Sequence, residues 1–75
     1  MVDYTLKVKR LLGIINENKN IKELNVYDVM FFLGTSQYIV AKTVLRALER
    51  SGIVKKIGNN YIIKGREYDD SNEEK

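Results

Sequence analysis

The stretch LNVYDVMFFLG at residues 24–34, together with LRALERSGIVKK at residues 45–56, decides the fold. In the first stretch, the Asn25 side chain can accept a backbone N–H at a helix start, and Asp28 completes a capping box three residues later. Leu24 can pack on Val29 as a hydrophobic staple. We therefore expect a helix over 26–33 that ends at Gly34, because glycine is favoured where a helix closes in the left-handed conformation.

A second, longer helix is expected over 36–51, because apolar residues recur there at i, i+3, i+4 and i+7. Thr35 or Ser36 can cap its start, and Gly52 ends it. The inward face of this helix is expected to consist of Ala41, Val44, Leu45 and Leu48.

The flanking segments predict one more helix and a hairpin. The first helix is expected over about 4–18, with Asp3 as its N-cap and an asparagine-rich turn after it; its apolar stripe is Tyr4, Val8, Leu11, Leu12 and Ile15. Residues 21–24 can form a short third strand. A β-hairpin is expected over 53–64, with strands at 53–57 and 61–64. Its turn residues, Gly58, Asn59 and Asn60, fit a loop of two or of three residues, and the loop length decides which side chains face inward.

The length and the charge distribution indicate one small domain with an acidic end. The chain has 75 residues, and its net charge of +3 is unevenly distributed. Residues 1–66 hold 12 basic and 5 acidic residues, whereas residues 67–75 hold one basic and 5 acidic residues. We therefore expect a basic domain over 1–66 and a disordered acidic tail over 67–75.

The residues that most enzymes and metal sites need are missing from the sequence. There is no His and no Cys, and the carboxylates Glu17, Glu23, Asp28 and Glu49 are dispersed without paired spacing. We expect no enzymatic activity, no metal site, no cofactor and no small-molecule effector. No apolar run approaches the roughly 18 residues of a membrane span, so we expect a soluble cytoplasmic protein without a membrane partner.

The expected order of elements is that of an α+β winged helix-turn-helix, with three helices followed by a hairpin wing. The stretch over 24–56 resembles the core of MarR-type and ArsR-type winged-helix repressors. In that family a Leu-x-x-Leu-x-x-x-Gly-Leu-Val pattern joins the recognition helix to the wing, and it is matched here by Leu45, Leu48, Gly52, Ile53 and Val54. The small size is also similar to compact regulators of archaeal viruses and plasmids. The resemblance implies a transcriptional repressor that acts by occupying an operator.

The face of the 36–51 helix opposite its apolar positions is suited to reading double-stranded DNA. Gln pairs well with adenine, Lys and Arg with guanine or phosphate, and apolar edges with the thymine methyl. The residues expected on this face are Gln37, Tyr38, Ile39, Lys42, Thr43 and Arg46, with Ser36 at the helix start near a phosphate. The wing would add Lys55, Lys56, Asn59, Asn60 and Lys64.

Each of these assignments has a structural alternative. Lys42 and Arg46 at i, i+4 are also the pattern of a solvated helix face. Lys55 and Lys56 can protect an edge strand from aggregation. Tyr61 is expected to be a core or cross-strand residue rather than a base-stacking one.

Phe31 and Phe32 are adjacent on one helix, so they cannot both face the same core. We expect one to pack inward and the other to join a homodimer interface, which would match two half-sites on DNA. The alternative is that both are absorbed within the domain. An alternative function that uses the same pair is a winged-helix protein-interaction module. RNA binding is less favoured, because no aromatic platform on a sheet is expected.

Overall fold

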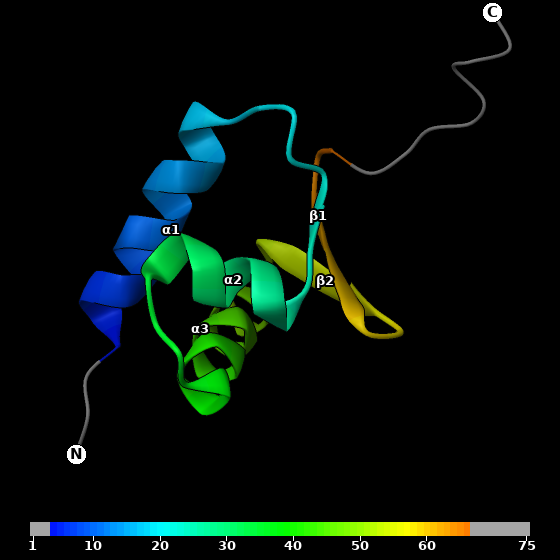
Figure 1. Cartoon of the computed structure of the whole chain (residues 1–75). Coiled ribbons are helices and arrows are strands. Elements are labelled where there is room, and N and C mark those ends of the chain that lie inside the picture. Colours follow the sequence, from blue (N-terminus) through cyan, green and yellow to red (C-terminus); the bar gives the residue numbers. More distant parts are fainter. Residues whose placement is uncertain (1–3, 67–75) are drawn as a thin grey trace, which may run out of the picture.

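Three helices precede a β-hairpin in the computed structural model, which describes residues 4–66 (Figure 1). The helices are α1 (Thr5–Glu17), α2 (Val26–Leu33) and α3 (Tyr38–Arg50). The short strand β1 (Glu23–Leu24) lies between α1 and α2, and β2 (Val54–Ile57) and β3 (Asn60–Ile63) form the hairpin. The expected acidic tail over 67–75 lies outside the described residues.

The three strands form one antiparallel sheet in the order β1-β3-β2. Leu24 of β1 is paired with Tyr61, and Val54 of β2 with Ile63, so β3 lies in the centre. The expected third strand near residues 21–24 is therefore confirmed. Three helices, a small sheet and a hairpin after the last helix make up the α+β arrangement of a winged helix.

The predicted capping box of α2 is present. The Asn25 Oδ1 accepts the Asp28 N–H at 2.8 Å, and the Asp28 carboxylate accepts the Asn25 N–H at 3.1 Å. At the other end, the Gly34 N–H donates to the Phe31 carbonyl and the Thr35 N–H to the Met30 carbonyl, the two bonds of a Schellman motif. Gly34 has φ of 68°, a value that favours glycine, so the predicted bounds of this helix are confirmed.

The start of α3 differs from the prediction. The helix begins at Tyr38 rather than at residue 36, and Gln37 is its N-cap without a side-chain bond. Neither Thr35 nor Ser36 caps it. Instead the Thr35 hydroxyl accepts the Gln37 N–H at 3.1 Å, which ties the hydroxyl into the connection and keeps the chain non-helical up to Gln37. The helix ends at Arg50, and Gly52 follows with φ of 80°.

The start of α1 also has no side-chain cap. Tyr4 occupies the N-cap position and makes no capping bond, and Asp3, the predicted cap, lies outside the described residues. The end of the helix is better secured, because both the backbone N–H and the side-chain amide of Asn18 donate to the Ile14 carbonyl. The asparagine-rich turn therefore ends the helix as expected.

The hairpin loop contains two residues, Gly58 and Asn59. Ile57 is paired with Asn60, so the strands run over 54–57 and 60–63 instead of the predicted 53–57 and 61–64. Gly58 has φ of 63°, and Asn59 has no positive φ, which is the φ pattern of a type II′ turn. The glycine supplies the left-handed conformation, so Asn60 is free to join the ladder.

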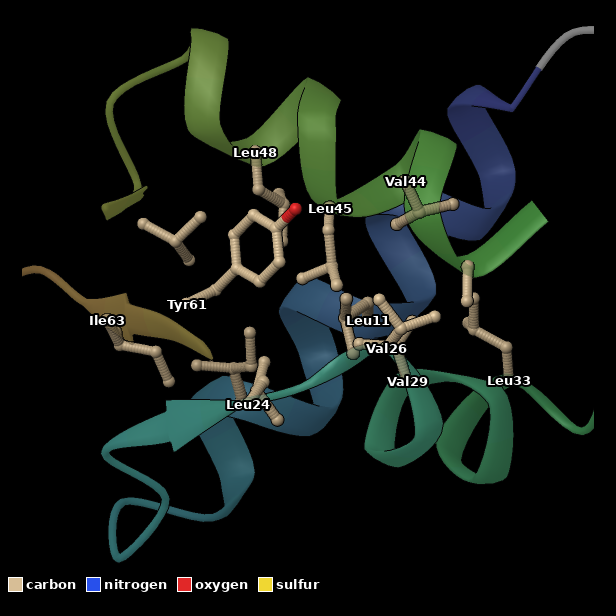
Figure 2. Close-up of a cluster of buried hydrophobic side chains, with 13 residues drawn as sticks. Leu11, Leu24, Val26, Val29, Leu33, Val44, Leu45, Leu48, Tyr61 and Ile63 are labelled. Atoms are coloured by element: carbon tan, nitrogen blue, oxygen red, sulfur yellow. The ribbon is translucent and has the colours of Figure 1, made fainter. Parts of the chain in front are cut away.

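Within residues 4–66 the buried side chains are all hydrophobic, Tyr61 included, and they come from all three helices and the sheet. All four predicted inward residues of α3 are fully buried, and Val40 beside them is also buried. Figure 2 shows the Tyr61 ring directed from β3 toward Leu45 and Leu48 of α3. Removing a side chain such as Leu48 would cost about 2–5 kcal/mol of unfolding free energy.

Arg66 connects the end of the hairpin to the loop that follows α1. Its Nη1 donates to the Asn18 carbonyl at 3.2 Å and to the Ile21 carbonyl at 3.0 Å. These bonds join the segment after β3 to the loop between α1 and β1.

Within residues 4–66, no helix is long and apolar enough to cross a bilayer.

Candidate nucleic-acid interface

The predicted reading residues of α3 lie on its solvent side. Ser36, Gln37 and Arg46 are exposed, and Ile39 is 62% exposed. Lys42 and Thr43 are half-buried. The opposite side of the helix packs into the core, so the expected division of α3 into an inner and an outer face is correct.

The side chains on this face are not all equally available. The Thr43 hydroxyl donates to the Ile39 carbonyl one turn earlier at 2.7 Å, so its proton is used within the helix. The Lys42 Nζ lies 5.9 Å from the centre of the Tyr38 ring, within the range of a cation–π interaction. Lys42 is therefore held beside Tyr38, whereas Arg46 is exposed one turn further along.

A groove of about 360 Å³ runs between α3, the start of α2 and the hairpin. We call it the tyrosine groove; its lining is Asn25, Val26, Tyr27, Tyr38, Lys42, Lys56, Asn59, Asn60 and Tyr61. Five of these were predicted as DNA-binding residues, from α3 and from the wing. The fold thus brings Tyr38 and Lys42 together with Lys56, Asn59 and Asn60 in one concave surface.

A second groove, of about 510 Å³, contains Thr43 and Arg46, two more of the predicted residues of α3. We call it the basic groove; it lies between α1 and α3 and is lined by Tyr4, Thr5, Val8, Lys9, Thr43, Arg46, Ala47 and Arg50. Lys9 and Arg50 were not predicted as site residues. Arg50 follows Arg46 by one helical turn, a spacing that could have identified it, whereas Lys9 comes from a different helix.

The two wing lysines lie on opposite faces of the hairpin. Lys56 is paired with the buried Tyr61 and lines the tyrosine groove, whereas Lys55 is paired with Ile62. Side chains alternate along a strand, so Lys55 points away from the groove. Lys64 follows β3 and is exposed. Neither groove is lined by Lys55 or Lys64, nor by the predicted residues Ser36 and Gln37.

Tyr61 is a core residue, as expected, but it also borders the tyrosine groove. It is 2% exposed, and this burial raises the pKa of its hydroxyl above the usual 10.0. The negative charge of Glu49 raises this pKa further, and the positive charge of Arg46 lowers it. Tyr61 therefore remains a neutral phenol at the base of the groove near neutral pH.

One of the two phenylalanines of α2 packs inward, as predicted, and the other is exposed. Phe31 is 82% exposed, whereas Phe32 is half-buried and packs against the core. Their rings meet edge to face, with centroids 5.9 Å apart. The alternative in which both are absorbed within the domain is wrong for Phe31.

No cluster of three or more metal-binding side chains occurs within residues 4–66. Comparison of the chain with protein-family models, curated proteins and solved structures gave no significant match. Function is therefore inferred from the fold and from the two grooves that flank α3.

Proposed function

We propose that this protein is a sequence-specific double-stranded DNA-binding regulator, and that it represses transcription by occupying an operator. The observation that carries the proposal is the position of α3, whose outer face is bordered on one side by the tyrosine groove and on the other by the basic groove. Lys42 and Lys56 lie in the first, and Lys9, Arg46 and Arg50 in the second.

The charges suit the two sugar-phosphate strands that border a major groove. An α-helix fits the major groove of B-DNA, and cations on both sides of it can then meet phosphates. Gln37, just before α3, and Ile39 and Arg46 on the helix are exposed and can contact base edges. Lys56, with Asn59 at the tip of the hairpin, can contact the backbone beside the adjacent groove.

In this proposal the protein acts by binding alone, with neither catalysis nor a cofactor, in the cytoplasm where the operator is accessible. A homodimer through Phe31 is part of the proposal, because an exposed phenylalanine favours burial against a second copy. Two copies related by a two-fold axis would read two half-sites about one helical turn apart.

Selection of bound duplexes from a random pool tests the proposal. Enrichment of a palindromic sequence would support DNA binding, base specificity and two-fold symmetry together. Enrichment of one non-repeated site would support a monomeric reader. Recovery of a pool without sequence preference would contradict a sequence-specific regulator.

A second candidate function is a protein-interaction module, and the 82% exposure of Phe31 favours it. The two candidates differ in their response to salt. Retention on duplex DNA that weakens steeply with salt would support the regulator, because cation–phosphate contacts release counterions. Absence of such retention would favour the interaction module.

A further inference from the structure

We propose that the tyrosine groove binds one unpaired nucleotide of a DNA strand that extends from the duplex on α3. This inference rests on the proposed function and deepens it, because it assigns a ligand to a surface that duplex reading does not use in full. Tyr27 is central to the inference, and it lies on α2, outside the predicted DNA-reading residues.

The groove presents two tyrosine rings that are not stacked on each other. The Tyr27 and Tyr38 centroids are 5.9 Å apart, and the ring planes are inclined by 63°. Tyr27 is 69% exposed and Tyr38 45% exposed. Lys42 lies over the Tyr38 ring, so the Tyr27 ring offers the more open π-face. An unstacked base can lie on such a face and place its edge against the second ring.

Hydrogen-bonding groups suited to a base edge line the same groove. Asn59, in the turn of the hairpin, brings a side-chain amide with a carbonyl acceptor and an NH₂ donor. Asn25 brings a second amide, whose Oδ1 already accepts the Asp28 N–H, so its NH₂ is the part offered to a ligand. Together these amides can pair with either donor or acceptor atoms of a base.

Two lysines border the groove from different elements. Lys42 belongs to α3 and Lys56 to β2, so a phosphate on either side of a bound nucleotide can find a cation. The groove volume of about 360 Å³ lies within the range of ordinary ligand sites, roughly 300–1,000 Å³. A base, a sugar and a phosphate therefore have matching surfaces in one groove.

Contact with duplex phosphates alone would not account for this lining. Lysines suffice for phosphates, whereas stacking on an exposed tyrosine face requires a base that has left its own stack. In a continuous duplex the base faces are covered by their neighbours. Because α3 borders the groove, a strand that leaves the duplex beside α3 can enter it directly.

The inference is tested by binding of the full chain to two DNA probes. One is a blunt duplex carrying a sequence selected as above, or a random blunt duplex if selection enriches none. The other is the same duplex with a four-thymine single-stranded extension, placed in turn at each 3′ and each 5′ end. The variants are Tyr27→Leu, which keeps apolar bulk without a π-face, and Tyr27→Phe, which keeps the ring. Leu6→Ala removes an exposed apolar side chain that lies outside both grooves.

The wild type should bind at least one extended probe about fivefold or more tightly than the blunt duplex, as expected for one base–aromatic stack. Tyr27→Leu should abolish this gain without changing affinity for the blunt duplex, whereas Tyr27→Phe and Leu6→Ala should keep it. Since the chain has five tyrosines and no tryptophan, quenching of tyrosine fluorescence by the extension gives an independent readout.

The possible failures are distinguishable. If no extension improves binding, or if Tyr27→Leu keeps the gain, the nucleotide site is wrong while duplex recognition stands. If the protein binds an extended probe in a Tyr27-dependent way but not the blunt duplex, the nucleotide site stands and the proposed regulator does not. If neither probe binds, both are wrong.

Discussion

The ammonium group of Lys42 lies 5.9 Å from the centre of the Tyr38 ring, one turn earlier on α3. A cation–π contact of this kind contributes about 0.5–1 kcal/mol at an exposed site. It holds a positive charge at the border between the outer face of α3 and the tyrosine groove. The same lysine can therefore serve a duplex phosphate or a nucleotide in the groove.

The wing lysines should differ in their effect on DNA affinity, because only Lys56 shares a groove with α3. We expect Lys56→Ala to weaken duplex binding several-fold and to lower the salt dependence by about one phosphate contact. Lys55→Ala removes the same charge from the other face of the same strand and should have a smaller effect. Fluorescence anisotropy at several salt concentrations measures both. Equal losses from the two variants would show that the wing acts only through its net charge.

The capping box of α2 should contribute measurably to stability. Asn25→Ala removes the acceptor for the Asp28 N–H and should lower the unfolding free energy by about 1 kcal/mol. In a domain of this size, that loss corresponds to a fall in Tm of about 4–8 °C. Asn25→Ser keeps a capping oxygen and should stay close to the wild type. Thermal unfolding followed by circular dichroism compares them, and an unchanged Tm for Asn25→Ala would contradict the role of this cap.

Burial of Tyr61 should make the fold sensitive to alkali. Burial raises the pKa of this hydroxyl in the folded state, whereas the unfolded chain titrates near 10.0. The unfolded state therefore loses its proton first, and the unfolding free energy should decrease as pH rises above about 10. Tyr61→Phe should show a smaller decrease. Urea unfolding between about pH 9 and pH 11 provides the comparison. Identical pH slopes for the two proteins would exclude Tyr61 as the source.

Local sequence signals predicted the helices and strands well. Asn25 and Asp28 predicted the start of α2, and Gly34 predicted its end. The apolar spacing in α3 predicted four residues on its inner face, and all four are fully buried. The start of α3 was predicted wrongly, because Thr35 and Ser36 both have capping side chains and the choice of the Thr35 hydroxyl to bond Gln37 depends on the path of the turn. The loop length of the hairpin also depends on the path of the turn, because Gly58, Asn59 and Asn60 all suit a tight turn.

Contacts between distant segments could not be predicted from the sequence. The tyrosine groove joins Tyr27 of α2 to Tyr38 of α3, and the basic groove joins Lys9 of α1 to Arg46. Neither pair has a sequence spacing that indicates contact, because each depends on how the helices pack. The different surroundings of Lys55 and Lys56 likewise follow from strand register, which the loop length determines.

Phe31 should be required for a dimer but not for the fold, since it is exposed in the single chain. We expect the wild type to sediment as a dimer at tens of micromolar and Phe31→Ser to sediment as a monomer with nearly unchanged Tm. Phe32→Ser, which removes a half-buried ring from the core, should instead lower Tm. A wild type that sediments as a monomer at that concentration would contradict the dimer.

The most direct test of DNA recognition by α3 is the salt dependence of duplex affinity for Lys42→Ala/Arg46→Ala. A matched control, Lys7→Ala/Lys19→Ala, removes two exposed charges that line neither groove. We predict that the first variant binds at least about tenfold more weakly and that its salt slope falls by nearly two, since each phosphate contact contributes about 0.9. The control should retain most of the affinity. Unchanged affinity of Lys42→Ala/Arg46→Ala, or equal losses in both double variants, would contradict recognition through α3.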